Sequence, residues 1–275
     1  MILHVTEAGA GPPVALLHGL FGRAQNLGTL ARRLASSMRV ISIDLRNHGA
    51  SPHAAGMDYP SQAADLWETL ASLNALPAAL LGHSMGGKTA MAAALLVPEK
   101  VSRLVVADIA PVGYTHQNTA IAAALQSIPL HPGITRADAD RRLRESIPDA
   151  AVRAFLLQNF LPGAAPGWRI GLDHIANDIK TLESWPQFPP GARYEGPTLF
   201  VSGARSDYVL PAHHGAIQQQ QLFPTARFEI IPEAGHWLHA DQPEAFGAVV
   251  EGFLRREVRP GLCPGPAGAG GPRPP

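Results

Sequence analysis

The sequence has one cysteine, no surplus of charge and no long apolar run, and each of these shortages excludes a class of protein. Cys263 has no second cysteine to pair with, so a disulfide within the chain and dithiol redox chemistry are excluded. The 22 Lys and Arg residues equal the 22 Asp and Glu residues, which leaves no basic excess for binding nucleic acid. Charge or proline interrupts every apolar stretch well before about 18 residues, the length of a membrane span. The start of the chain also lacks the pattern of a secretion signal, so we expect a cytoplasmic protein.

Short apolar runs alternate with helical patterns along most of the chain. With 46% hydrophobic residues, a chain of 275 residues can form a single core of the α/β type. The alternation is typical of a mostly parallel sheet that is covered by helices on both faces. The predicted strands cover residues 3–5, 14–17, 39–44, 78–81, 103–108, 198–201 and 227–231.

The pentapeptide Gly82-His83-Ser84-Met85-Gly86 stands between a predicted strand and a helical stretch over residues 88–96. A serine at such a turn takes a strained backbone that lifts its hydroxyl clear of the sheet, and the flanking glycines let helix and strand approach closely. An ordinary Gly/Ser turn is the alternative. Strand, turn and helix all fall where a nucleophile elbow requires them, so the motif predicts Ser84 as the nucleophile of an α/β hydrolase.

A serine hydroxyl needs a base to take its proton, and α/β hydrolases place that histidine near the end of the chain. His236 lies there, on a loop after the predicted strand over residues 227–231. A metal site on His236 and His239 is the alternative. Pro232, Gly235 and Pro243 favour a loop over a helix, and no acidic or cysteine ligands accompany the two histidines, so we expect no metal.

The oxyanion of a serine hydrolase needs two backbone N–H donors. One donor is the residue after the nucleophile, Met85. The other lies on a loop after an early strand, and the segment His18-Gly19-Leu20-Phe21-Gly22 follows such a strand, so we assign it to Leu20. A second loop, over residues 44–49, turns sharply after its strand, and we interpret its Asp, Arg and His as groups that stabilise the turn in preference to groups that contact substrate.

The acid that orients the histidine has two candidates. In most α/β hydrolases it follows the penultimate strand, but Ser206 stands at the usual position here and Asp207 comes one residue late. A shift of one residue on a loop can turn a carboxylate away from its target. Asp108 is the other candidate, because it ends the strand directly after the elbow helix and would emerge at the same sheet edge as Ser84.

Four segments together resemble the bacterial YbfF-type esterases and their mitochondrial abhydrolase relatives. They are residues 18–22, residues 44–52, the elbow over residues 82–88 and Asp108-Ile109-Ala110-Pro111-Val112, and the match runs from about residue 3 to residue 254. In that group the acid comes from the position of Asp108, and a serine at the later loop supports the histidine. The resemblance therefore implies a triad of Ser84, Asp108 and His236 with Ser206 as an auxiliary residue, while Asp207 stays the alternative acid.

The alternation of strands and helices breaks between residues 112 and 196. Helical patterns cover residues 117–126, 136–145, 151–160 and 170–185, with no convincing strand. We predict a helical cap over 112–196 inserted into an α/β-hydrolase core made of 1–111 and 197–257. Residues 258–275 are rich in Pro and Gly and are predicted to form a disordered tail.

Aromatic residues of the cap and of the loops around Ser84 are candidates for the walls of a substrate pocket. The alternative for each is packing between the cap helices and the core. The candidates are Phe21, Phe155, Phe160, Trp168, Trp185 and Trp237.

The predicted activity is hydrolysis of carboxylic ester or thioester bonds through an acyl-enzyme, on small to medium acyl substrates as the resemblance implies. The mechanism needs no cofactor, and the predicted partner is a small-molecule substrate. Two alternatives are a carbon–carbon bond hydrolase of a diketone, which uses the same serine machinery, and a non-catalytic ligand-binding α/β hydrolase. Dehalogenase and epoxide hydrolase chemistry would need a carboxylate in place of Ser84.

Overall fold

A computed structural model describes residues 1–115, 118–213, 217 and 222–255. The strands are β1 (Val5–Ala8), β2 (Pro13–Leu17), β3 (Arg39–Ile43), β4 (Ala78–His83), β5 (Val101–Ala107), β6 (Phe160–Leu161), β7 (Gly167–Trp168), β8 (Thr198–Gly203) and β9 (Ala226–Ile231). The α-helices are α1 (Gly28–Leu34), α2 (Tyr59–Ser72), α3 (Met85–Leu96), α4 (Asn118–Gln126), α5 (Arg136–Leu143), α6 (Ala150–Leu157), α7 (Leu172–Glu183), α9 (Leu238–Asp241) and α10 (Pro243–Arg255). Short 3₁₀ turns cover Ala24–Leu27 and Pro98–Lys100.

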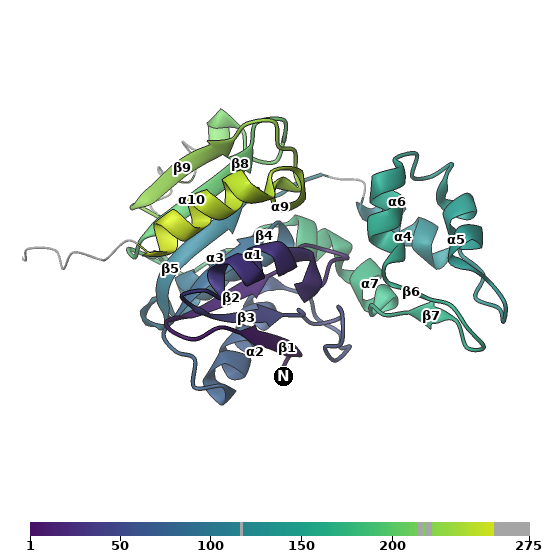
Figure 1. The fold of residues 1–275 in the computed structure, drawn as a ribbon, viewed down its shortest axis with the longest axis horizontal. Helices are drawn as coiled ribbons and strands as arrows, with labels where there is room; N and C mark the ends of the chain where they lie inside the picture. Colours follow the sequence, from purple (N-terminus) through teal and green to yellow (C-terminus); the bar gives the residue numbers. More distant parts are fainter. Residues whose placement is uncertain (116–117, 214–216, 218–221, 256–275) are drawn as a thin grey trace, which may run out of the picture.

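A seven-stranded sheet in the order β1-β3-β2-β4-β5-β8-β9 forms the centre of the molecule (Figure 1). Only β1 runs antiparallel to its neighbour, and all other neighbouring strands of this sheet are parallel. His83 pairs with Ala107, and Ala107 pairs with Val201, so β4 and β5 end at the same level and β8 continues for two more residues to Gly203. The residues that follow these strands are therefore brought together at one edge of the sheet.

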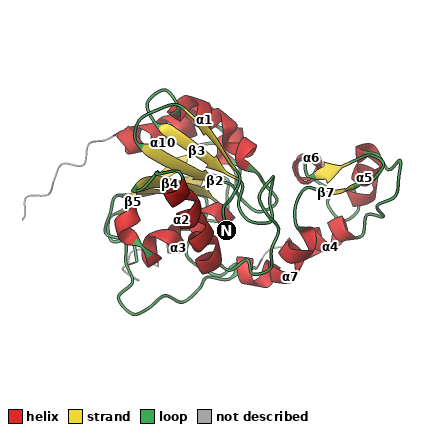
Figure 2. Cartoon of the chain, turned by 90° about the horizontal axis from the view of Figure 1, so that it is seen from below, coloured by secondary structure: helices red, strands yellow, loops and turns green. Residues whose placement is uncertain are grey.

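Helices cover both faces of this sheet and bury its strands on both sides. In β4, Ala79 and Leu81 face a cluster with α1 and α10, whereas Ala78 and Leu80 face a second cluster with α2 and α3. Figure 2 shows the sheet between these two pairs of helices. Continuous apolar runs are what a parallel sheet requires when both faces are covered. The predicted α/β fold, with a mostly parallel sheet, is confirmed.

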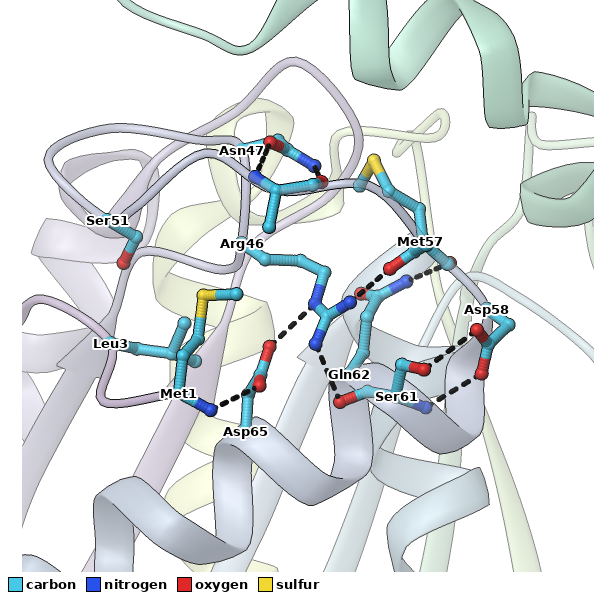
Figure 3. A network of polar contacts seen from close by, with 12 residues as sticks. Met1, Leu3, Arg46, Asn47, Ser51, Met57, Asp58, Ser61, Gln62 and Asp65 are labelled. Carbon is cyan, nitrogen blue, oxygen red and sulfur yellow. Dashed lines mark hydrogen bonds and ion pairs between the residues drawn. The ribbon is translucent and has the colours of Figure 1, made fainter.

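A buried polar network fixes the loop between β3 and α2 (Figure 3). Arg46 Nε donates to Asp65 at 2.6 Å, and its other nitrogens donate to the carbonyls of Gly56 and Ser61. Asp58 caps α2 by accepting from Ser61 N at 2.8 Å. Moving the loop would separate the buried ion pair of Arg46 and Asp65 and leave each charge uncompensated. The network therefore stabilises the position of the loop beside the sheet edge.

The segment over residues 112–196 lies to one side of the sheet and carries α4, α5, α6 and α7 (Figures 1 and 2). The expectation that it contains no strand was wrong, since β6 and β7 pair antiparallel, with Phe160 opposite Trp168. The helix predicted over residues 151–160 ends at Leu157 instead. Two paired residues on each side of a Pro- and Gly-containing turn are too short to show a strand period in the sequence.

Most other elements match their predicted ranges within a few residues, but the first strand covers Val5–Ala8 instead of residues 3–5. The predicted tail over 258–275, which includes Cys263, lies outside the described residues, as does Gln117 at the predicted start of a helix. Among the helices in the described part of the chain, none has both the length and the apolar character to cross a bilayer.

Candidate active site

Ser84 occupies a sharp turn between β4 and α3. Its backbone has φ 54° and ψ −119°, and its N–H donates to Ala107 O at 3.0 Å. A Cβ on Gly82 would lie 2.0 Å from the carbonyl oxygen of Gly86, and a Cβ on Gly86 would lie 2.4 Å from that of Leu17. Only glycine fits these two positions, because any side chain would force the helix away from the sheet.

A chain of hydrogen bonds connects Ser84, His236 and Asp108. His236 Nε2 lies 3.1 Å from Ser84 Oγ, and His236 Nδ1 lies 2.7 Å from Asp108 Oδ2. A carboxylate only accepts hydrogen bonds, so Nδ1 carries the ring proton and Nε2 is left to accept from the serine hydroxyl. This geometry suits a serine, histidine and acid relay for nucleophilic attack.

Asp108 is fully buried and is held by two further donors. Gly203 N donates to its Oδ1 at 3.0 Å, and the Ser206 hydroxyl donates to its Oδ2. Asp207, the alternative acid, is exposed. The structure therefore brings Asp108 to His236 and Ser206 to Asp108, and it leaves Asp207 exposed.

The His236 ring has two neighbours that the sequence analysis did not identify. The Tyr208 ring stacks on it with centroids 3.7 Å apart, and His83 Nε2 donates to the His236 carbonyl at 2.8 Å. Tyr208 is itself held by Tyr114, whose hydroxyl donates to the Tyr208 carbonyl at 2.6 Å. Tyr208 lies two residues after Ser206 in the sequence, and this short spacing was the signal that could have predicted its place beside His236.

The loop over residues 18–22 is held beside Ser84 by two buried histidines. Phe21 N donates to His48 Nε2, and Leu45 N donates to His18 Nε2, each at 3.0 Å. Burial lowers the pKa of His48 to about 3 and also lowers the pKa of His18, so both rings are neutral acceptors near pH 7. His48 thus supports the loop over residues 18–22, and its Nδ1 donates to Arg46 O at 2.9 Å within its own turn, as the interpretation from sequence expects.

The two predicted oxyanion donors lie next to Ser84 and line the same cavity. Met85 is the first residue of α3, and the first N–H groups of a helix have no partner within it. In the described part of the chain, the Leu20 N–H donates no backbone hydrogen bond. Both amides are thus free to receive an oxyanion, and their role stays a prediction.

A cavity of about 250 Å³ opens at Ser84 between the segment over residues 112–196 and the segments before and after it. Three of the predicted wall residues line it, and two of them face each other, with the Phe155 and Trp237 rings 5.3 Å apart. Helices α4 and α6 contribute further apolar walls. The apolar lining includes Leu20, Phe21, Ile109, Ile121, Val152, Phe155, Leu156 and Trp237.

The prediction that Phe160 and Trp168 line this cavity is wrong. Phe160 is fully buried and packs against Trp168 with ring centroids 5.5 Å apart, across the β6–β7 hairpin. Trp185 packs against Tyr59 and Phe188. These three aromatics pack within the segment over residues 112–196 or between it and α2, in agreement with the packing alternative.

Lys88 is a buried amine at the cavity whose role the sequence did not reveal. Only 2% of it is exposed, and its Nζ donates to the carbonyls of Glu183 and Ser184 at 3.1 and 2.7 Å. Burial lowers the pKa of this amine to about 7. The lysine thus ties the last turn of α7, where helix carbonyls lack partners, to the elbow helix.

The histidines near the site pack as rings and are not arranged as metal ligands. The His83 ring lies 4.8 Å from that of His236 and 4.7 Å from that of His239. Within the described ranges, no group of three or more His, Cys, Asp or Glu side chains is placed to hold a metal ion.

Comparison with known proteins identifies the family of the chain. The family model for the alpha/beta hydrolase fold matches residues 12–243. The chain belongs to this family. This α/β hydrolase is 40% identical over 252 residues to the mouse protein named sn-1-specific diacylglycerol lipase ABHD11, with 88% of this chain and 81% of the mouse protein covered.

Two further comparisons agree with this assignment. The Escherichia coli protein named esterase YbfF is 36% identical over 243 residues, which cover 88% of this α/β hydrolase and 92% of the relative. A solved structure described as a marine microorganism esterase superposes with a TM-score of 0.88 at 38% identity, covering 92% of this chain and 99% of that one. The resemblance to the YbfF-type esterases is confirmed.

Proposed function

We propose that this α/β hydrolase cleaves carboxylic ester or thioester bonds through an acyl-enzyme on Ser84. The observation that carries the proposal is the hydrogen-bonded chain from Ser84 through His236 to Asp108 at the mouth of an apolar cavity. Relatives named esterase and diacylglycerol lipase support the same class of reaction.

The mechanism follows from the positions of the polar atoms. His236 Nε2 accepts the hydroxyl proton as Ser84 Oγ attacks the carbonyl carbon, and Asp108 stabilises the imidazolium that forms. The N–H groups of Leu20 and Met85 receive the oxyanion. His236 then protonates the leaving alcohol or thiol, and later takes a proton from the water that hydrolyses the acyl-enzyme. Ser206 acts through Asp108, since its hydroxyl donates to that carboxylate.

The segment over residues 112–196 acts as a cap that limits the acyl group, with the core formed by the segments before and after it. Helices α4 and α6 supply apolar walls to the cavity. Its volume of about 250 Å³ lies below the roughly 300–1,000 Å³ of pockets for drug-sized ligands, which favours small to medium acyl chains. The cytoplasmic location and the absence of a nucleic-acid partner stay predictions.

Turnover of p-nitrophenyl acetate and butyrate, compared with a diketone, tests this function. An ester hydrolase releases p-nitrophenol from both esters and leaves the diketone intact. Efficient cleavage of the diketone with slow turnover of the esters would instead identify a carbon–carbon bond hydrolase. Turnover of none of these compounds would favour a ligand-binding protein.

A further inference from the structure

Three arginines converge where the cap meets the loop over residues 18–22. Arg136 begins α5, and its Nη2 donates to Phe160 O at 3.3 Å. Arg169 follows β7, and its N–H donates to Asn159 O at 2.8 Å. Arg136 is thus attached to the first residue of the hairpin, and Arg169 is attached to the residue before it.

Arg23 joins this group from the core. Asn159 Nδ2 donates to Phe21 O at 2.7 Å, two residues before Arg23. Arg23 N donates to Asn26 Oδ1 at 2.6 Å, and Asn26 lines the cavity at Ser84. The arginine cluster, meaning Arg23, Arg136 and Arg169, therefore lies beside the rim of the candidate active site.

None of the three arginines of the cluster forms an ion pair with a carboxylate of the described residues. Among the described residues, every ion pair that includes an arginine involves an arginine other than Arg23, Arg136 and Arg169. Burial lowers the pKa of Arg23, and the charges of Arg169 and Arg136 lower it further, with Asp44 opposing them. The carboxylate of Asp44 is already occupied by Ala24 N, Ala50 N and His4 Nδ1 at 2.7, 2.9 and 3.1 Å.

Three polar side-chain atoms at the arginine cluster also lack a hydrogen-bond partner. The Nε atoms of Arg23 and Arg169 and the Oδ1 of Asn159 are buried without a partner, and they are three of the five such side-chain atoms in the described chain. Buried polar groups in proteins nearly always have partners, and an unpaired one is costly. Two of these atoms are cationic donors, so a bound group that supplies acceptors and negative charge would satisfy them.

We propose that the arginine cluster binds a phosphate group carried by the leaving alcohol or thiol of the substrate. The planar guanidinium presents donors in a fork that matches phosphate oxygens, and Arg23 and Arg169 are partly exposed. The acyl chain enters the apolar cavity, while the phosphate stays at the rim. This inference rests on the proposed ester or thioester hydrolysis and adds the chemistry of the leaving group.

Matched substrates that differ only in the phosphate test the proposal. The short pair is 1-butyrylglycerol and its 3-phosphate, and the long pair is S-butyrylpantetheine and its 4′-phosphate. For each enzyme variant, the quantity compared is the ratio of kcat/KM for the phosphorylated compound to that for the unphosphorylated compound. We expect the phosphate to raise kcat/KM by about tenfold or more in one of the two pairs, because hydrogen bonds to charged groups are strong.

Arg23→Gln and Arg169→Gln should bring this ratio close to one, and Arg23→Lys should retain part of it. Arg32→Gln is the matched control, because Arg32 is exposed on α1 and donates to Thr29, and its ratio should equal that of the wild type. Circular dichroism checks the folding of each variant. Added salt should reduce the ratio in the wild type, since it screens exposed charges.

Two results would overturn the proposal. One is a wild-type ratio at or below one for both pairs, and in that case inhibition by inorganic phosphate would identify an adventitious ion only. The other is a ratio above one that survives both glutamine variants. Hydrolysis of the unphosphorylated compounds is measured in the same experiment, so a failure of the proposed function would be seen separately as the loss of all turnover.

Discussion

Two residues of the candidate triad lie in backbone conformations that L-residues seldom adopt. Ser84 has φ 54° and Asp108 has φ 52°, and each such residue costs on the order of 1–3 kcal/mol. The sheet maintains both, because Ser84 N donates to Ala107 O and Asp108 N donates to Val201 O at 3.0 and 2.8 Å. This backbone turns both side chains toward His236 at the edge of the sheet.

Mutation of the two candidate acids, Asp108 and Asp207, tests directly which of them orients His236. Asp108→Asn should lower kcat by about 10⁴, as in a serine protease whose triad acid was replaced by its amide, because the histidine then takes the wrong tautomer. Asp207→Asn is the matched control on an exposed carboxylate and should have little effect. Ser206→Ala should cost about 10- to 100-fold, since its hydroxyl donates to a charged oxygen.

Steady-state kinetics with p-nitrophenyl butyrate, at one mildly alkaline pH, measures all three variants. A severe loss in Asp207→Asn together with a mild loss in Asp108→Asn would mean that the loop rearranges during catalysis and that Asp207 is the acid.

The sequence predicted the residues that belong to local motifs and missed those that act only through the tertiary fold. Ser84 and Asp108 follow short apolar strands, so their position at the sheet edge could be inferred. Tyr208 and Lys88 carry no motif for their roles, because the stacking on His236 and the contact with the end of α7 join distant parts of the chain. The same reason explains why Phe160 was assigned to the wrong surface.

At the scale of elements, α6 faces the cavity with one side and the core of the cap with the other. Phe155 lines the cavity, whereas Phe160, just after the helix, is fully buried in the hairpin contact. Phe155→Ala should therefore shift the preferred p-nitrophenyl ester toward longer acyl chains with a modest effect on stability. Phe160→Ala should leave the preference unchanged and cost about 3–5 kcal/mol of unfolding free energy.

Acyl-chain profiles from acetate to decanoate, with urea denaturation of each variant, check this pair. If Phe160→Ala moves the profile and Phe155→Ala does not, the cavity described above is not the acyl site.

The strands and most helices were predictable because each one shows a clear period or a continuous apolar run. The β6–β7 hairpin was not, since two paired residues give no period and the segment between them is rich in Pro and Gly. The cap boundaries at 112 and 196 follow from where the strand alternation stops, and they stay a prediction.

At the scale of the whole molecule, four histidines with lowered pKa values link stability to pH. Burial lowers the pKa values of His18, His48, His83 and His239, to about 3 for His48 and about 4 for His239. Their pKa values are therefore lower in the folded state than the ordinary 6.5 of the unfolded state. The unfolded state binds more protons below pH 6.5, so stability is fully present above that pH and is lost as the pH falls toward 4.

Each of these histidines should contribute up to about 1.4 kcal/mol per pH unit to the loss. Urea denaturation at pH 7.5, 6 and 5 measures the slope. His239→Gln should lower the slope by the amount that corresponds to nearly one proton, because the pKa of His239 in the folded state is about 4 and its buried Nδ1 has no partner. His131→Gln, on an exposed residue, should keep the wild-type slope. Equal slopes in all three proteins would contradict this explanation.

Covalent labelling of Ser84 tests the central claim most directly. A fluorophosphonate should add one adduct to the wild-type protein, located at Ser84 by peptide mass spectrometry, and should stop hydrolysis of p-nitrophenyl butyrate. Ser84→Ala should fold normally, take no label and lose kcat on the order of 10⁶, as in a well-studied serine hydrolase. A Ser84→Ala protein that is still labelled, or that keeps more than a few per cent of the activity, would contradict the mechanism.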